Sequence, residues 1–285
     1  MKNVMKKIGW FLVSMLPVAL YFGIQLGCCM AVMFVLAVVE MLNTPVELQA
    51  DSLVIGVTEQ YMENIVPILI VCQLVSLLVF GLWYYFAWGK KKRPESAEKP
   101  KAGKLLLIVL LGVAFQFAIS ALLSMVEMLI PSALEEYNEL MEMAGITEFT
   151  VLSLISTVIL APLSEELACR GVVYRLAGKI SPNFWVANVV QALAFGILHG
   201  NLVQGAYAFV LGLVLGLVYR QFQNIWICML LHAAMNGSSV LVAPYYNLFP
   251  ENLAIPVLIV TMILGGAAAA LCLKGVLKKQ PARQL

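Results

Sequence analysis

Long uncharged, mostly apolar stretches dominate this chain of 285 residues, and short segments between them carry its charged residues. Seven such stretches are Ile8–Val39, Asn64–Gly89, Leu105–Val126, Phe149–Ser164, Ile180–Tyr219, Gln221–Pro250 and Asn252–Leu273. A helix needs about 20 largely apolar residues to cross roughly 30 Å of hydrocarbon. Most stretches suffice for one crossing, and the 40-residue stretch Ile180–Tyr219 suffices for two. The pattern predicts an all-α, polytopic membrane helical bundle of about eight transmembrane helices.

Composition supports this prediction and narrows the partners. Hydrophobic residues make up 62% of the chain and charged residues only 12%, with a mean hydropathy of +0.92. Soluble domains carry about twice that charged fraction, because their surface faces water. We therefore expect a multi-pass integral protein of the cell membrane whose first partner is the lipid bilayer. The formal net charge of +2 indicates no nucleic-acid partner.

The basic residues predict the orientation of the helices. If the N-terminus is cytoplasmic and eight helices alternate, all 18 lysines and arginines fall on the cytoplasmic side. The loops expected outside, Leu42–Tyr61, Pro131–Thr147 and Tyr245–Leu253, carry acidic residues only. Cytoplasmic loops of membrane proteins are enriched in Lys and Arg. We therefore expect both termini to be cytoplasmic.

One polar segment, Lys90–Lys104, has the composition of a linker, because it is rich in Lys, Pro, Glu and Ala. It divides the chain into residues 1–104, a transmembrane helix pair followed by this basic cytoplasmic loop, and residues 105–285, a six-helix bundle. The external segment Ser132–Thr147 is acidic and helix-prone, which is consistent with a helix lying at the membrane interface.

Three charged residues follow the fourth apolar stretch, in the string APLSEELACRG. Glu165 lies 16 residues after Phe149, about 24 Å along a helix and still at hydrocarbon depth. An ionisable group at that depth indicates function unless it is paired. Glu166 and Arg170 are four residues apart and can pair on one helix face. Glu165 lies on another face and is predicted to be the free carboxylate.

The chain has two histidines, and both lie in apolar stretches. His199 follows Phe195 by one helical turn, and Asn236 follows His232 by one turn on the same face. A histidine in a membrane helix can simply hydrogen-bond a neighbouring helix, so each one alone is weak support for a site. Two imidazoles and Glu165 could hold zinc with an open position for water. The same groups could also work without metal, with a carboxylate base and donors to an oxyanion.

These residues resemble the type II CAAX-protease and bacteriocin-processing family of intramembrane proteases, also called CPBP or Abi. The family has an EExxxR motif, an FxxxH motif and an HxxxN or HxxxD motif on successive helices. Here they are Glu165-Glu166-x-x-x-Arg170, Phe195-x-x-x-His199 and His232-x-x-x-Asn236, in that order. The resemblance covers about residues 147–246 and implies an intramembrane endopeptidase that hydrolyses a membrane-associated, prenylated or bacteriocin-like peptide.

The resemblance also implies roles for individual residues. Glu165 activates water with help from His199, and His232 and Asn236 hold the tetrahedral oxyanion.

The remaining motif residues, Glu166 and Arg170, are implied to orient Glu165. A metalloprotease alternative makes Glu165, His199 and His232 metal ligands, so zinc is one possible cofactor and a metal-free glutamate mechanism is the other.

Two functions of other classes use the same residues. A membrane immunity or peptide-binding protein would use the pocket without cleavage. A proton-coupled transporter would use Glu165 and the histidines as a relay. We expect the three motifs to converge in a water-filled cavity nearer the cytoplasmic side.

Overall fold

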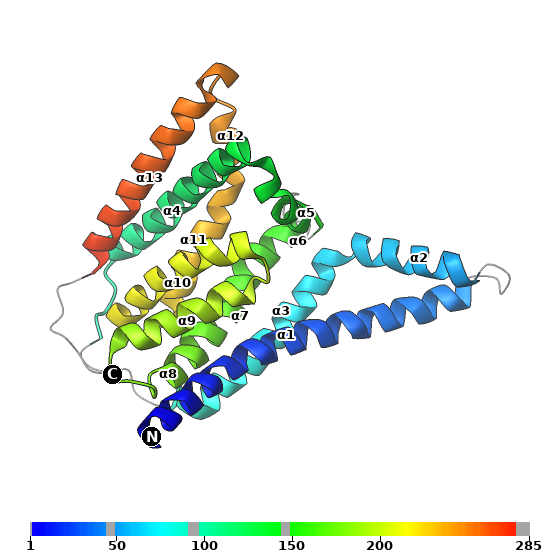
Figure 1. Cartoon of the computed structure of the whole chain (residues 1–285), viewed down its shortest axis with the longest axis horizontal. Helices are drawn as coiled ribbons and strands as arrows, with labels where there is room; N and C mark the ends of the chain where they lie inside the picture. Colours follow the sequence, from blue (N-terminus) through cyan, green and yellow to red (C-terminus); the bar gives the residue numbers. More distant parts are fainter. Residues whose placement is uncertain (1, 44–48, 91–96, 144–148, 278–285) are drawn as a thin grey trace.

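The computed structural model describes residues 2–43, 49–90, 97–143 and 149–277, and its regular structure there is helical (Figure 1). The α-helices are α1 (Lys2–Asn43), α2 (Gln49–Glu63), α3 (Ile65–Tyr84), α4 (Ala102–Leu129), α5 (Glu135–Met143), α6 (Val151–Leu154), α7 (Ala161–Glu166), α8 (Tyr174–Ala177), α9 (Phe184–Leu198), α10 (Leu202–Phe222), α11 (Ile225–Ser238), α12 (Val242–Tyr246) and α13 (Ala254–Val276). The predicted all-α membrane bundle is confirmed.

Seven helical segments of the described chain are long and apolar enough to cross a membrane. They are Lys2–Asn43, Ile65–Gly89, Ala102–Leu129, Val151–Ala177, Leu202–Phe222, Ile225–Tyr246 and Glu251–Val276. The remaining expected helix is α9, which is apolar but only 15 residues long. A multi-pass membrane protein is therefore confirmed. A total of eight crossings and cytoplasmic termini stay predictions, and the division at residue 104 does too.

Some basic segments that predicted the orientation lie outside the described residues, namely positions 91–96 of the linker and the tail from 278 onward. The expected external loop Leu42–Tyr61 contains a helix that was not predicted, because Gln49–Glu63 forms α2, and its external location stays a prediction. Its helix packs against α1, where Gln60 Nε2 donates to Glu40 Oε2 at 2.9 Å. The helix expected in the acidic segment Ser132–Thr147 is confirmed as α5.

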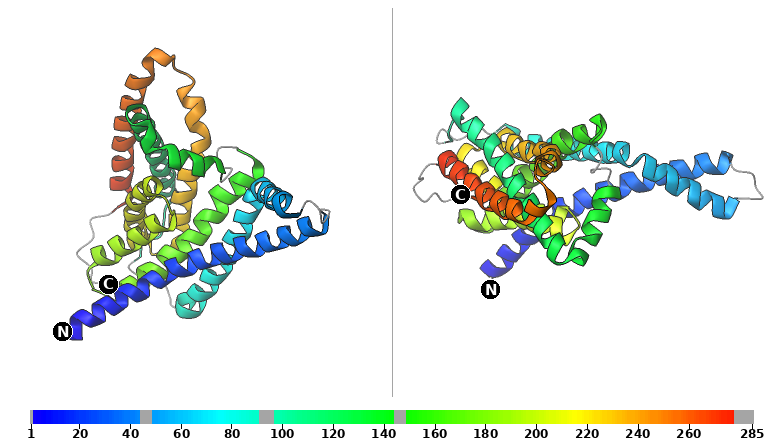
Figure 2. Two further views of the ribbon diagram at one scale, coloured as in Figure 1. Left: turned by 45° about the vertical axis from the view of Figure 1, so that its right-hand side comes forward. Right: turned by 90° about the horizontal axis from the view of Figure 1, so that it is seen from above.

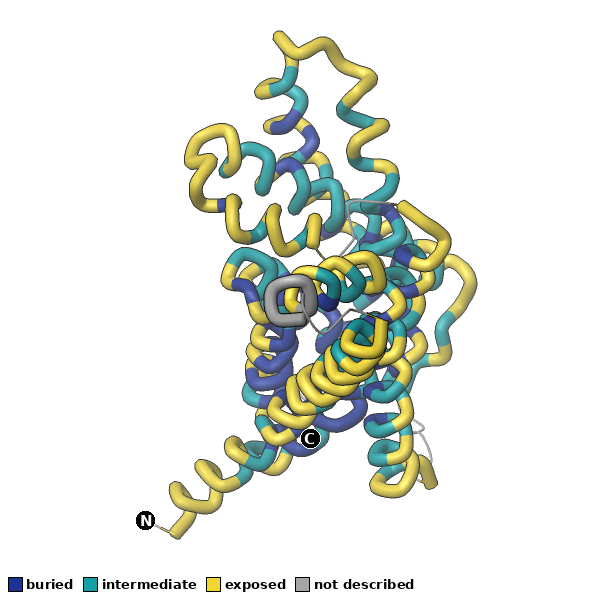
Figure 3. The backbone as a smooth tube through the Cα atoms, turned by 90° about the vertical axis from the view of Figure 1, so that its right-hand side faces the viewer, coloured by how far each residue is buried: buried dark blue, intermediate teal, exposed yellow. Residues whose placement is uncertain are grey.

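The helices form a bundle from which one hairpin projects. The distal half of α1 and all of α2 extend away from the other helices in all three ribbon views (Figures 1 and 2). At the opposite side, α4 packs against both α11 and α13. Buried residues concentrate on the helices between these two sides, whereas α1 and α13 are mostly exposed (Figure 3). Exposed apolar side chains on the outer helices are expected where the solvent is lipid.

The α9–α10 hairpin is built around small residues and one tight turn. A Cβ atom placed on Gly196 would lie 2.7 Å from the Gly205 carbonyl oxygen, so the two helices touch backbone to backbone. In the turn, Gly200 has φ +68°, a left-handed conformation that glycine adopts at little cost. Asn201 then caps α10, because its Oδ1 accepts from the backbone N–H groups of Val203 and Gln204. This geometry places His199 at the end of a short helix, inside the bundle.

The close approach of these helices predicts a specific sensitivity. Gly196→Ala should lower the free energy of unfolding by about 1–3 kcal/mol, because the added methyl group meets backbone that cannot move alone. Gly266→Ala in α13 is the matched control, since a methyl group added there would meet nothing within 4 Å. Thermal unfolding of both variants in detergent measures the difference, and equal midpoints would contradict the proposed helix contact.

Candidate active site

Glu165 and Glu166 lie on a helical segment whose regular hydrogen bonding is interrupted on both sides. Wider π-helical turns occupy Ile155–Leu160 and Leu167–Val173, before and after α7. Pro162 stands at the start of α7 and has no N–H to donate to the preceding turn. Single π-helical turns within α-helices are often found at functional sites. Here they place both glutamates on a locally irregular helix within the bundle.

The missing donor at Pro162 links this segment to α11. In a π-turn, the carbonyl of residue 157 would accept from the N–H of residue 162, which is a proline. Instead, Asn236 Nδ2 donates to the Thr157 carbonyl oxygen at 2.8 Å. One N–H of the Asn236 amide is therefore used, while its second N–H and its oxygen remain available. This contact fixes Asn236 relative to the helix that carries Glu165.

Glu166 and Arg170 form the predicted ion pair, and both side chains are fully buried. Arg170 Nη1 donates to Glu166 Oε1 at 2.8 Å, and Nη2 donates to the Gly212 carbonyl oxygen at 3.3 Å. The guanidinium carbon lies 4.5 Å from the centre of the Phe195 ring. Charged groups removed from water need such partners to persist. The pair thus connects the glutamate-bearing helix to α10 and α9.

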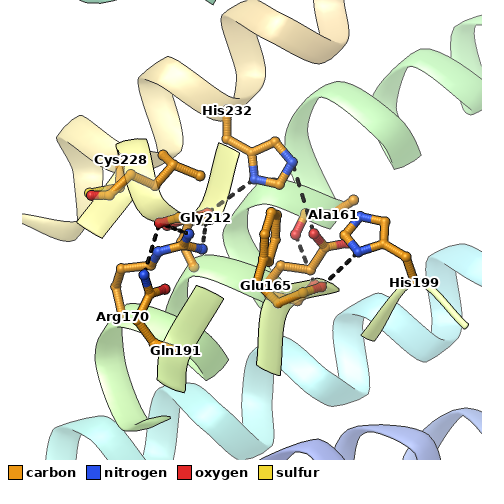
Figure 4. A network of polar contacts seen from close by, with 12 residues as sticks. Ala161, Glu165, Arg170, Gln191, His199, Gly212, Cys228 and His232 are labelled. Carbon is orange, nitrogen blue, oxygen red and sulfur yellow. Dashed lines mark hydrogen bonds and ion pairs between the residues drawn. The ribbon is translucent and has the colours of Figure 1, made fainter. Parts of the chain in front are cut away.

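His232 joins this pair to the free carboxylate. Its Nδ1 lies 3.1 Å from Glu166 Oε1 and its Nε2 lies 3.9 Å from Glu165 Oε2. A carboxylate paired with Arg170 only accepts hydrogen bonds, so Nδ1 of His232 carries a proton. Its Nε2 then faces Glu165, and the side chains of Glu165, His199 and His232 point toward one another (Figure 4).

His199 is held by its own helix. Its Nδ1 lies 2.8 Å from the Phe195 carbonyl oxygen. Because a carbonyl only accepts, Nδ1 carries the proton, and Nε2 of the neutral ring is an acceptor. The Phe195 ring contacts both imidazoles edge to face, with centroids 5.0 Å from His199 and 5.4 Å from His232. The phenylalanine of the FxxxH motif therefore spaces the two histidines and covers Arg170.

The residues predicted to be catalytic line one cavity of about 410 Å³: Glu165, His199, His232 and Asn236. The Glu165 side chain is 15% exposed, in contrast to fully buried Glu166. Its Oε2 has no hydrogen-bond partner within the described residues. The expected convergence in a cavity is confirmed, and of the two adjacent glutamates Glu165 is the one that lines it. Whether the cavity lies nearer the cytoplasm stays a prediction.

The metal-ligand alternative fits this arrangement poorly. Across residues 2–43, 49–90, 97–143 and 149–277, no three His, Cys, Asp or Glu side chains are arranged to hold a metal ion. Zinc sites in enzymes normally use three protein ligands at about 2.0–2.3 Å from the metal. Glu165, His199 and His232 do not form that set, and the hydrolysis proposed for this chain uses no metal.

Two uncharged polar residues of α9 support the site and were not predicted from the sequence. Gln191 Nε2 donates to the Gly212 carbonyl oxygen at 2.8 Å, the same oxygen that Arg170 contacts. It also donates to Asn188 Oδ1 at 2.8 Å, and Asn188 Nδ2 donates to the Leu213 carbonyl at 3.2 Å. Both side chains are fully buried in an apolar helix. Their position one turn apart was the signal that could have identified them.

A further unpredicted contact comes from the N-terminal helix. Tyr21 of α1 is buried and lines the cavity, and its hydroxyl lies 3.4 Å from Ser164 Oγ. Ser164 in turn donates to the Ala161 carbonyl oxygen at 3.1 Å. The residue directly before Glu165 is thus held from outside the motif region.

Comparison with known proteins finds a family match over the region that carries the motifs. Residues 147–238 match the family model of Rce1-like proteins, the type II CAAX prenyl endopeptidases. All three motifs fall inside the match, so the resemblance drawn from the motif residues is confirmed. The match supports a protease, whereas bacteriocin processing, the Abi assignment and a metalloprotease stay predictions.

The alignment with one curated relative is longer than the motif region. "Putative membrane peptidase YdiL" of Bacillus subtilis (strain 168) is 20% identical over 167 residues, which cover 59% of this chain and 66% of that protein. The chain therefore spans just under two thirds of that relative's length. No solved structure matches the chain at a significant level.

The buried ion pair predicts a pattern of stability. Arg170→Gln should lower the free energy of unfolding by about 3–5 kcal/mol, because it leaves the Glu166 charge buried without its partner. Removing both charges, in Glu166→Gln with Arg170→Gln, should restore much of that loss. Chemical or thermal unfolding in detergent compares the single and double variants. A double variant as unstable as the single one would show that unpaired charge is not the cause.

Proposed function

We propose that this chain, whose residues 147–238 carry the Rce1-like match, is an intramembrane endopeptidase in which Glu165 activates the hydrolytic water. The single observation that carries the proposal is the convergence of Glu165, His199, His232 and Asn236 on one cavity inside a membrane bundle. A partly exposed carboxylate without a partner for Oε2 is suited to act as a general base. The substrate class is a membrane-associated or lipidated peptide.

In the proposed first step, a water molecule in the cavity gives a proton to the Glu165 carboxylate and attacks the carbonyl carbon of the scissile peptide bond. His199 presents Nε2 as a second acceptor, since its Nδ1 proton is directed to the Phe195 carbonyl. This acceptor orients the other O–H bond of the water. The base and its helper then hold the nucleophile in one orientation, which lowers the entropic part of the barrier.

The carbonyl oxygen becomes negatively charged in the tetrahedral intermediate and needs donors. The second N–H of the Asn236 amide is available, because the first is fixed on Thr157. His232 can donate through Nε2 only when both ring nitrogens carry protons, since Nδ1 already donates to Glu166. Oriented donors of this kind contribute about 10²–10³-fold in rate.

In the final step, the intermediate collapses and the carbon–nitrogen bond breaks. Protonated Glu165 returns its proton to the leaving amine, and the products are a new carboxyl group and a new amino terminus. The buried Glu166–Arg170 pair does not react in this scheme. Its part is to hold His232, and through it the position of the oxyanion site.

Replacing the proposed base should abolish turnover without unfolding the protein. Glu165→Gln keeps the side-chain volume and should reduce cleavage by about 10²–10⁴-fold, the usual contribution of a general base. Detergent-purified protein is incubated with a pool of prenylated and unprenylated peptides, and new termini are identified by mass spectrometry. Glu251→Gln, an exposed glutamate outside the cavity, is the control.

Retained cleavage by Glu165→Gln would overturn the role of this residue. A folded wild-type protein that cleaves no peptide would favour the peptide-binding or immunity function. If a proton gradient drives uptake that Glu165→Gln uncouples, the transporter function is favoured instead.

Because no set of three metal ligands is found among the described residues, the protein should not depend on a metal. Cleavage should persist after dialysis against a strong chelator, and metal analysis should find less than one equivalent of zinc per chain. His232→Ala should then lower activity without changing the metal content. Stoichiometric zinc that disappears in His232→Ala together with activity would establish the metalloprotease alternative.

A further inference from the structure

The wall of the active-site cavity carries four glutamine side chains from four different helices. They are Gln25 of α1, Gln73 of α3, Gln116 of α4 and Gln204 of α10. Each is partly buried in a helix that is otherwise strongly apolar. Polar side chains in membrane helices usually face the bundle interior and mark the path of a polar ligand or contacts between helices. Because four amides from different helices converge on one cavity, we favour the explanation that they contact a polar ligand.

Three of these amides have unused hydrogen-bonding capacity. The Gln25 side chain makes no hydrogen bond to any other described residue. Gln73 accepts at Oε1 from Ser156 Oγ at 3.0 Å, which leaves its NH₂ group for another partner. Gln116 donates from Nε2 to Ser120 Oγ at 3.0 Å, which leaves its oxygen free to accept. The wall thus offers both donors and acceptors to whatever occupies the cavity.

Formal charge is nearly absent from the same wall. Among the described lining residues, Glu165 is the single Asp, Glu, Lys or Arg, and the other polar groups are amides, hydroxyls, one thiol and the two imidazoles. A charged side chain of a ligand would find no opposite charge there apart from the proposed base. The complementary ligand is therefore uncharged, with donors and acceptors along its length.

An extended peptide has this chemistry. Inside the bundle, backbone N–H and C=O groups that leave a helix lose their contact with bulk water and need hydrogen-bond partners on the cavity wall or in bound water. Peptide hydrolysis needs such an unwound segment, because the scissile carbonyl must be open to attack. Amide side chains match peptide groups, since both carry one carbonyl oxygen and N–H donors.

We infer that the amides of Gln25, Gln73 and Gln116 bind the backbone of an extended, uncharged segment of the peptide substrate. The identity of the ligand as a substrate rests on the proposed function, whereas binding itself does not require cleavage. Recognition through backbone groups is tolerant of sequence. The three glutamines belong to α1, α3 and α4, which lie outside the matched residues 147–238.

The test measures binding with the Glu165→Gln protein, so that the probe is not consumed. The probe is a fluorescent octapeptide of alanine and leucine, paired with the same peptide carrying N-methyl groups on alternate backbone nitrogens. We expect the unmethylated peptide to bind at least tenfold tighter. Adding Gln25→Leu, Gln73→Leu and Gln116→Leu should weaken its binding about tenfold and reduce the preference over the methylated peptide to near one. The matched control is Gln60→Leu, which removes an amide of α2 outside the cavity.

A preference that is unchanged in the triple variant overturns the inference, as does equal binding of the two peptides by the parent protein. If the triple variant does not fold, Gln25→Leu alone decides, because that side chain supports no hydrogen bond of the described structure. It should lower the preference by several-fold, and an unchanged preference is contrary to the inference. Failure of the proposed function is separate, since it appears as binding without cleavage by the wild-type chain.

Discussion

The buried pair of Glu166 and Arg170 is the constraint on which the rest of the site depends. Neither side chain reaches solvent, so each charge must be satisfied within the bundle. Arg170 contacts Glu166, a carbonyl of α10 and the face of Phe195 on α9, while Arg170 Nε and Glu166 Oε2 have no hydrogen-bond partner within the described residues. Glu166 also receives His232 from α11. One ion pair therefore fixes four helical segments at a single point, and the free carboxylate Glu165 is positioned as a consequence.

The cavity beside that pair is composite. The residues proposed to be catalytic come from the region that matches the Rce1-like model, while α1, α3, α4 and α5 supply much of the remaining wall. The tyrosine hydroxyl of α1 reaches the residue before Glu165. A match confined to the motif region thus describes the chemistry of the site, and the shape presented to a substrate depends on helices that lie outside it.

The sequence predicted the fold class and the composition of the site, because both depend on local patterns. Apolar stretches longer than a bilayer predict membrane helices, and the spacing of Glu166 and Arg170 predicts their ion pair. The sequence did not predict α2, because its acidic and polar residues resemble those of a loop. It also could not assign Asn236 to the Thr157 carbonyl or bring glutamines of four helices together. These contacts join residues far apart in the chain, and only packing determines them.

The length of α1 has a consequence for the surrounding lipid. Its 42 residues extend about 63 Å, roughly twice the hydrocarbon thickness of a bilayer. Apolar side chains stay exposed along its distal half, among them Leu26, Met30 and Phe34. An upright helix would leave them in water, and keeping the apolar stretch Ile8–Val39, about 48 Å long, in hydrocarbon needs a tilt beyond the usual range of about 0–40°. Lipids on that side of the protein would therefore meet a long apolar arm, a different boundary from the one beside α4 and α13.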